Sequence, residues 1–445
     1  MVSVAVAGPS PEHRLVGDTM TPFQIAAIGV CVLINALDGF DVLAIAFTAP
    51  AISREWGLSP TQVGGLFSAG LAGMGLGAFT IAPLGDKFGR RPAILFCLAL
   101  LTVGMLLSAY VGSLSELAIT RIVTGLGIGG ILASINTAVA EFASPRRRSL
   151  AISCMALGYP VGATIGGLAA VPLIQAFGWR SVYVLGAAVA ALLIPMVLAL
   201  LPESVHFLTA RRPTRAIEKI NRVRARFRQP PLAVLPEPVA YVAGEQNRVS
   251  DLFRGQMLAT TFLVLMLNIC VMATVYFTVS WTPKMLSQLG FSDSIGIYAS
   301  LMMNAAGAIG CLLFGLFANR FGLRNLSAAT FLGMGLALAA FGLAPAQAGA
   351  LIVTAFIAGF FLNTSITCLY TILPQVFAPA TRSTGTGIGL GGGRIGAVLG
   401  PYMAGVLIAA DWSRAAYCIA LALPMLVAIV VLFALPKAQI QNRVI

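Results

Sequence analysis

Long apolar stretches recur along the whole chain and constrain its fold more than any other feature of the sequence. Each is about 20 residues long, the length that a helix needs to cross about 30 Å of hydrocarbon. Only 10% of the 445 residues are Asp, Glu, Lys or Arg, against about 25% in soluble proteins. The twelve stretches are 23–50, 61–83, 92–111, 115–140, 149–174, 179–201, 257–283, 294–318, 326–344, 348–374, 384–408 and 413–435. The sequence therefore predicts an all-α membrane protein with twelve transmembrane helices.

The net charge of +13 is concentrated in alternate connections between these stretches. Basic clusters lie at 87–91, 146–148 and 211–228, and the connections on the opposite side hold few cations. By the positive-inside rule, this asymmetry predicts that both termini are cytoplasmic. We expect a multi-pass protein of the cell inner (plasma) membrane, without a cleavable signal peptide because residues 1–21 lack an apolar core. The charge is thus a topology signal and does not indicate a nucleic-acid partner.

Residues that carry enzymatic or metal chemistry are scarce. The two histidines, His13 and His206, lie at or outside the predicted membrane ends, and the seven cysteines form no Cys-x-x-Cys pair. No His-Glu-x-x-His motif is present. We therefore expect no catalytic residues, no metal site and no cofactor, and we expect that the chain is not an enzyme.

The chain repeats itself with an offset of about 233 residues. GDKFGRR at 85–91 aligns with ANRFGLR at 318–324, and EFASPRRRS at 141–149 aligns with QVFAPATRS at 375–383. Two parallel repeats about an axis normal to the membrane are one known layout of transporters. We predict two pseudo-symmetric six-helix bundles with these boundaries: an N-terminal tail at 1–21, a first bundle at 22–202, a cytoplasmic linker at 203–256, a second bundle at 257–436 and a C-terminal tail at 437–445.

Several motifs resemble those of a known family. GDKFGRR at 85–91 is similar to the signature between helices 2 and 3 of the major facilitator superfamily, and RIVTGLGIGG at 121–130 resembles its helix 4 signature. DGFD at 38–41, PESVHFL at 202–208 and RSTGTGIGLGGGRIGAVLGP at 382–401 resemble the aromatic acid:proton symporters within that superfamily. The resemblance implies the superfamily fold and proton-coupled uptake of a small aromatic carboxylate, such as a hydroxybenzoate-type acid, by alternating access.

Two carboxylates lie in the first apolar stretch. Asp38 and Asp41 are three residues apart and so share one helix face, and a charge at the bilayer centre costs at least about 2.5 kcal/mol. Arg121, in the fourth helix, lies at a similar depth when helical rise is counted from the same membrane surface. We interpret these three residues as the proton-coupling site. The alternatives are a cap at a helix break at Gly39 and a static salt bridge.

Arg394 lies near the middle of the eleventh helix with no acidic residue near it in sequence. A buried guanidinium binds carboxylates in a bidentate manner, which favours an anionic substrate; pairing with Asp38 is the alternative. Other residues on helices expected to line a cavity complete the predicted substrate site, with core packing or interhelical hydrogen bonds as the alternative: Phe40, Asn268, Tyr276, Phe277, Asn363 and Tyr370.

Charged residues at the cytoplasmic helix ends are candidates for a gate that changes as the bundles rock against each other. The alternative is simple anchoring of the loops. The candidates are Asp86, Arg90, Arg91, Glu141, Arg148 and Arg382.

Other classes of protein fit the sequence less well. An efflux antiporter of this superfamily carries a Gly-Pro pair in helix 5, whereas Tyr159 separates Gly158 from Pro160 here. A proton-coupled symporter of another small metabolite, a sugar or an organic acid, is the alternative, but a sugar symporter would not need Arg394. A ligand sensor usually has a large extra tail. The expected partners are a small anionic substrate and the lipid bilayer, with the proton as coupling ion, and we expect the chain to function as a monomer.

Overall fold

The structure, a computed structural model, describes residues 20–234, 252–377 and 382–436. Within these ranges, twelve helical segments are long and apolar enough to cross a membrane, as the sequence predicts. They are α2 (Pro22–Trp56), α3 (Pro60–Thr80) with α4 (Ala82–Phe88), α5 (Arg90–Tyr110), α6 (Leu114–Phe142), α7 (Arg148–Phe177), α8 (Arg180–Leu200), α11 (Gly255–Gln288), α12 (Asp293–Phe321), α13 (Leu323–Leu343), α14 (Ala348–Val376), α15 (Arg382–Ala409) and α16 (Arg414–Ala434).

Local signals in the sequence fix where the first two long helices begin. Thr21 and Ser59 each accept a hydrogen bond from the backbone N–H three residues on, and Gln24 and Gln62 return the bond with their side chains. These reciprocal capping boxes satisfy N–H groups that have no partner inside the helix. Gly57 ends α2 in the left-handed conformation, with φ of 62°. The turn between α2 and α3 is therefore short and well defined.

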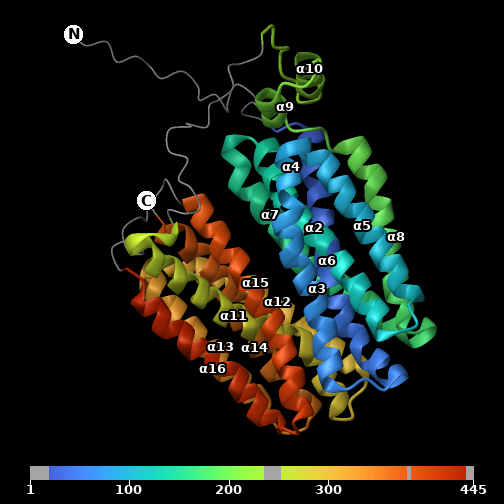
Figure 1. The fold of residues 1–445 in the computed structure, drawn as a ribbon, viewed down its shortest axis with the longest axis vertical. Helices are drawn as coiled ribbons and strands as arrows, with labels where there is room; N and C mark the ends of the chain where they lie inside the picture. The colour runs from blue at the N-terminus through green and yellow to red at the C-terminus, as the bar shows by residue number, and fades with distance from the viewer. Residues whose placement is uncertain (1–19, 235–251, 378–381, 437–445) are drawn as a thin grey trace.

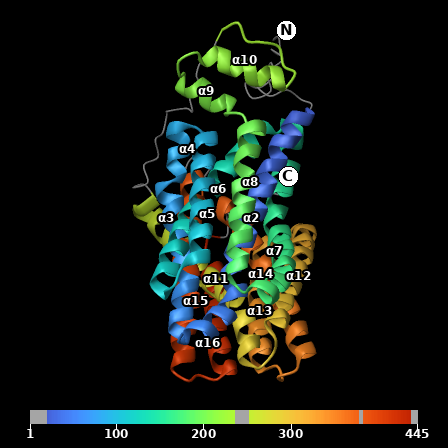
Figure 2. The ribbon, with the colours of Figure 1, turned by 90° about the vertical axis from the view of Figure 1, so that its right-hand side faces the viewer.

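The helices form two bundles, which Figure 1 shows as α2–α8 and α11–α16. The segment between them contains α9 (Val205–Arg211) and α10 (Ala216–Arg226), which lie across one end of the first bundle (Figure 2). Phe227, at the end of α10, packs against Phe23 and Phe142, with ring centroids 6.2 and 6.1 Å apart. We call this end of the molecule the linker side and the opposite end the far side.

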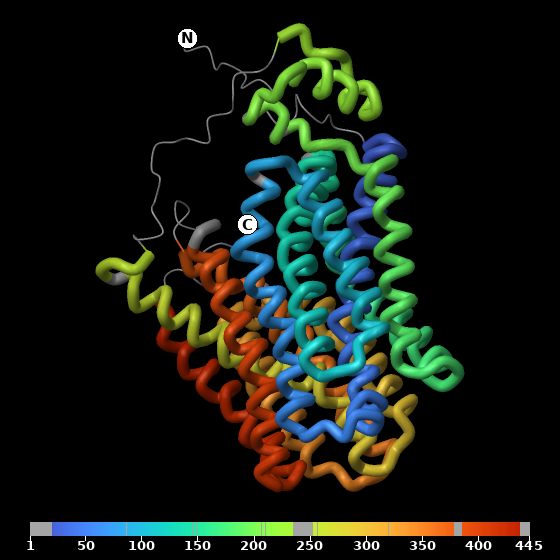
Figure 3. Tube along the Cα trace, turned by 45° about the vertical axis from the view of Figure 1, so that its right-hand side comes forward, coloured from blue at the N-terminus to red at the C-terminus, as the bar shows by residue number. Residues whose placement is uncertain are grey.

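The two bundles touch each other mainly on the far side. The ribbons converge there and separate toward the linker side (Figures 1 and 3). Phe67 stacks edge-on against Trp281, and Ser68 donates a hydrogen bond of 2.6 Å to the backbone oxygen of Val398. Further polar contacts join the ends of the bundles: Arg54 with Asp293 and Ser287, Thr61 with Gly405, and Gln175 with Ser294. The molecule is therefore closed on the far side.

The repeated Phe-Gly of the two loop motifs has a conformational explanation. Gly89 has φ of 111° and Gly322 has φ of 78°, values that residues with a side chain rarely adopt. Each glycine immediately precedes a helix of the second hairpin in its bundle, α5 or α13. A Cβ atom on Gly89 would in addition collide with the carboxylate of Glu203. The glycine of each motif therefore allows the positive φ angle at equivalent turns of the two bundles. At Gly89 the missing side chain also leaves room for Glu203.

Candidate functional site

The first element of the site is a buried ion pair inside the first bundle. Arg121 of α6 donates a hydrogen bond of 2.9 Å to Oδ1 of Asp41 on α2, and the two side chains are 2% and 5% exposed. A second guanidinium nitrogen bonds to Ser108 Oγ at 3.1 Å, and the guanidinium lies 4.8 Å from the ring centre of Tyr183. The pairing expected from helix depth is therefore present, whereas a role in proton coupling stays a prediction.

Ser108 and Tyr183 are parts of this site that the sequence reasoning missed. Ser108 also takes part in a hydrogen bond of 2.8 Å with Thr120, and the Tyr183 hydroxyl bonds to Thr48 at 2.9 Å. The hydroxyl groups next to the ion pair thereby each have a partner. A hydroxyl on an otherwise apolar helix was the available signal, since such groups usually bond across helices.

Asp38 lies one helical turn before Asp41 and has a different environment. It is 2% exposed, and its Oδ1 atom has no hydrogen-bond partner among the described residues. It lies within electrostatic range of both Arg394 and Asp41, without forming a salt bridge in the described part of the chain. A buried carboxylate oxygen without a partner is costly, so this atom is well suited to hold a proton or meet a ligand.

Arg394 reaches from α15 of the second bundle toward the first. Its guanidinium donates a hydrogen bond of 3.1 Å to the Tyr276 hydroxyl and lies 4.0 Å from the Met74 sulfur on α3. A Cβ atom on Gly75 would lie 3.5 Å from the Arg394 Cβ. Within the described residues, no carboxylate lies at ion-pair distance from this cation. Of the two interpretations made from sequence, an open anion site fits these contacts better than a pair with Asp38.

Aromatic residues from both bundles surround Arg394 and Asp38. Tyr370 of α14 and Tyr159 of α7 lie within electrostatic range of both charges, and Tyr276 of α11 lies within range of Arg394. Tyr370 is 55% exposed and Tyr159 is half-buried. Tyr276 and Tyr370 were predicted from sequence. Tyr159 was missed as a site residue, because the Gly158-Tyr159-Pro160 segment was considered only as a mismatch to an antiporter motif.

The remaining predicted substrate residues pack within their own bundles. Phe40 fills the space above glycines of α7 and α8, and Phe277 stacks edge-on against Tyr417 at 6.3 Å. Asn363 lies against Gly307 of the neighbouring α12. These contacts match core packing, and a role in substrate binding stays a prediction for all three. Asn268 is buried next to Gly393, and its Oδ1 atom has no partner in the described chain.

The predicted gate residues lie at the linker side, where part of the arrangement can be described. The backbone N–H of Arg90 donates a hydrogen bond of 2.9 Å to Glu203, and the Arg91 side chain bonds to the backbone oxygen of Leu198. These contacts tie α5 to the end of α8. Arg148 has an interaction partner, and Glu141 Oε2 is buried without one among the described residues. The side chains of Asp86 and Arg382 lie outside the described structure, so the gate stays a prediction.

Glu203 is a half-buried acid at the linker side that the sequence analysis placed only within a motif. Its carboxylate accepts hydrogen bonds of 2.9 Å from the backbone N–H groups of Arg90 and Ser204. Burial raises the pKa of Glu203 above its usual value, and these hydrogen bonds only partly oppose that effect. The residue therefore couples the loop after α8 to the beginning of α5.

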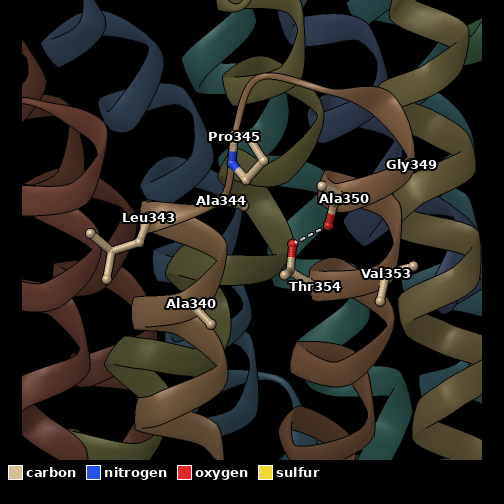
Figure 4. A pocket seen from close by; sticks show the side chains of 8 residues that line it. All are labelled: Ala340, Leu343, Ala344, Pro345, Gly349, Ala350, Val353 and Thr354. Atoms are coloured by element: carbon tan, nitrogen blue, oxygen red, sulfur yellow. Dashed lines mark hydrogen bonds between the residues drawn. The ribbon is translucent and has the colours of Figure 1, made fainter.

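An apolar depression lies well away from these charges. It has a volume of about 560 Å³ and lies between the ends of α13 and α14, lined by Leu343, Pro345 and Val353 among others (Figure 4). Its one polar side chain, Thr354, bonds to the backbone oxygen of Ala350 at 2.8 Å. The depression has no group to hold a charged or polar ligand and faces outward, as a lipid-contacting surface does. No group of three or more metal-ligating side chains was found in the described residues either.

Comparisons with known proteins agree with this arrangement. The sequence model of the Major Facilitator Superfamily matches residues 31–347 and 306–444. The chain is 30% identical to the gallate transporter of Pseudomonas putida, over 87% of this chain and 86% of that one. It is 29% identical to the 4-hydroxybenzoate transporter PcaK of Acinetobacter baylyi, over 95% and 93% of the two chains.

Among solved structures, the inward open conformation of the xylose transporter XylE from E. coli matches the fold with a TM-score of 0.71. The match covers 94% of this chain and 98% of that one at 16% identity. The family match, the twelve spans and the two bundles agree, and the chain is a membrane transporter, not an enzyme, that belongs to the Major Facilitator Superfamily.

Proposed function

We propose that this transporter carries a small aromatic carboxylate across the membrane together with a proton. The observation that carries the proposal is Arg394, a cation placed between the bundles whose described contacts are one tyrosine hydroxyl and one sulfur atom. A guanidinium in such a place is stabilised by a carboxylate, which it binds in a bidentate manner. The two relatives described above are named for gallate and 4-hydroxybenzoate, which supports a benzoate-type acid.

The tyrosines around Arg394 support an aromatic ligand. Tyr276 hydrogen-bonds to the guanidinium, and Tyr370 has more than half of its surface exposed. Ring stacking of the ligand on such side chains adds about 0.5–1.5 kcal/mol beyond the area that it buries. A sugar would use hydroxyl-binding groups and would leave the positive charge of Arg394 without a counter-ion.

Proton coupling follows from charge balance at the same place. An anionic substrate that enters beside Asp38 brings a second negative charge into a poorly solvated space. A proton on Asp38 removes the repulsion and leaves Arg394 free for the substrate carboxylate. Asp41 and Arg121 form the adjacent pair, and protonation of Asp41 would release Arg121. Substrate and proton therefore favour each other's binding.

We propose further that the linker side faces the cytoplasm, because the basic connections lie on that side. The contacts between bundles on the far side then correspond to a conformation open to the cytoplasm. Transport requires the opposite state, in which these contacts break and the bundles meet on the linker side. The Asp86, Arg90, Arg91, Glu141, Arg148 and Arg382 set is proposed to form contacts in that second state.

The test is accumulation of labelled 4-hydroxybenzoate in vesicles that contain the purified protein. We expect uptake above the equilibrium level when the outside is more acidic than the inside, and loss of accumulation when a protonophore is added. Unlabelled 4-hydroxybenzoate should compete with the label, whereas 4-hydroxybenzamide, which has the same shape without the charge, should compete far more weakly. Equal competition by acid and amide would rule out the proposed carboxylate-binding role of Arg394 and would favour a neutral substrate such as a sugar.

A further inference from the structure

Tyr159 and Arg394 lie within electrostatic range of each other but come from different bundles. Tyr159 belongs to α7 of the first bundle, whereas Arg394, Tyr276 and Tyr370 belong to the second. A Cβ atom on Gly39 would collide with the backbone oxygen of Tyr159, so α2 and α7 touch directly at the residue that follows Asp38. Close packing of these helices therefore fixes Tyr159 beside Asp38.

The hydroxyl of Tyr159 is available to a ligand. The Tyr183 hydroxyl is bonded to Thr48 and the Tyr276 hydroxyl to Arg394. The Tyr159 hydroxyl makes no hydrogen bond to any residue that the structure describes, and it is not among the fully buried groups without a partner. Asp38 is near but leaves its own Oδ1 atom unbonded. The hydroxyl thus keeps its hydrogen-bonding capacity, and it lies close to Asp38 and Arg394.

We propose that Tyr159 determines specificity for ring-hydroxylated acids, by forming a hydrogen bond with the ring hydroxyl of a substrate whose carboxylate is bound by Arg394. In a para-hydroxylated benzoate the two polar groups are at opposite ends of a rigid ring. A carboxylate fixed on the second bundle therefore directs the hydroxyl toward the first. Tyr370 is less suited to this role because it comes from the same bundle as Arg394.

A ligand held in this way links the two bundles. Its carboxylate contacts the second bundle and its ring hydroxyl contacts the first, so both ends are bound only while the bundles are close together. Such a ligand has a different affinity for open and closed states, which is the requirement for driving a conformational change. An acid without the ring hydroxyl would bind to Arg394 alone and would favour closure less.

The inference rests on the proposed function, and the experiment separates the two. The purified transporter is titrated with labelled benzoate, and unlabelled benzoate and 4-hydroxybenzoate compete with the label. The variant is Tyr159→Phe, which removes one oxygen and keeps the ring. We expect it to weaken 4-hydroxybenzoate about fivefold to tenfold, the loss of one neutral hydrogen bond, and to leave benzoate within about twofold.

Two further variants serve as controls. Tyr110→Phe removes a hydroxyl from a tyrosine that is 77% exposed at the end of α5, and should change neither acid. Tyr276→Phe removes the hydroxyl that contacts Arg394, and should affect both acids to a similar degree.

Equal weakening of both acids by Tyr159→Phe, or no change in either, would overturn the role of Tyr159 while leaving aromatic acid transport intact. Failure of the wild-type protein to bind either acid would overturn the proposed function and this inference together.

Discussion

Each bundle contains an arginine with a role in the candidate site, but the protein contacts of the two arginines differ. Arg121 is 1% exposed and is held by Asp41, Ser108 and the face of Tyr183, all from its own bundle. Arg394 is only partly buried, contacts Tyr276 and Met74, and extends toward the other bundle. One cation is enclosed by partners from its own bundle, with only its Nε atom unbonded among the described residues, and the other has a place for a further partner.

This difference separates a structural charge from a charge that can bind. A buried ion pair contributes little net stability when intact, yet removing one partner typically costs about 3–5 kcal/mol. Arg121 therefore ties α2 to α6, and its pairing changes only if Asp41 changes its charge. Arg394 has no such partner among the residues that the structure describes, so an anion that enters between the bundles can supply the missing interaction. The first arginine is suited to sensing protonation and the second to binding substrate.

The largest effect is expected when the enclosed pair is broken. In Asp41→Asn an amide replaces the carboxylate, so the residue can no longer carry a proton and Arg121 loses its counter-ion. We expect complete loss of proton-driven accumulation, while exchange of substrate across an undriven membrane survives at a reduced level. Accumulation and exchange are measured in the same vesicles. If the variant still concentrates substrate, Asp41 is not the coupling acid, and Asp38→Asn becomes the variant to test.

A second variant tests whether the geometry of the enclosed pair matters as well as its charge. Arg121→Lys keeps the positive charge but cannot contact Asp41 and Ser108 together with a planar group. We expect transport to fall severely with normal membrane insertion, measured as initial uptake rate per inserted protein. Near-normal uptake would indicate that Arg121 is only a counter-ion.

An intermediate effect is expected at the open cation. Arg394→Ala removes a charge-assisted hydrogen bond to the substrate, a loss of about 1.5–3 kcal/mol. The apparent dissociation constant for 4-hydroxybenzoate should therefore rise by one to two decades. Protein stability should change much less than in Asp41→Asn, because no counter-ion of Arg394 lies in the described part of the chain to be left behind. A large loss of stability with unchanged affinity would reverse the contrast between the two arginines.

Much of this arrangement can be predicted from the sequence, because membrane insertion imposes strong rules. The lengths of the apolar stretches give the spans, and helical rise from a common surface brings Asp41 and Arg121 to the same depth. Side-chain direction is harder to predict. Phe40 and Phe277 are on the expected helices but point into their own bundles, and Tyr159 points to the centre from a segment without a charge. Periodicity is weak in helices that are apolar on all sides, so it does not distinguish these faces.

A smaller effect is expected from the contact that joins the bundles on the far side. Arg54 and Asp293 form an ion pair between α2 and α12, and the Arg54 side chain is 59% exposed. An exposed pair contributes about 0.2–1 kcal/mol, so Arg54→Ala should shift the balance of conformations up to about fivefold toward opening on the far side. The reactivity of a single cysteine introduced on the far side measures this shift. A double variant with Asp293→Ala should show no further change, and additive shifts would mean that the two residues act independently.

The smallest effect is expected at Glu203, which extends the comparison to a half-buried acid whose hydrogen bonds come from backbone N–H groups. Its pKa is raised above the ordinary 4.5, mainly by burial, so the folded state favours the protonated form. Its contribution to stability is therefore fully present below about pH 4.5 and is lost as the pH rises through the raised value. Glu203→Gln keeps an oxygen for the N–H groups of Arg90 and Ser204 but does not ionise. The unfolding temperature of the purified wild type, measured from pH 4 to 8, should fall relative to that of Glu203→Gln as the pH increases. Parallel curves would mean that the backbone N–H groups stabilise the carboxylate as well as water does. A charge at this position would then need no counter-ion.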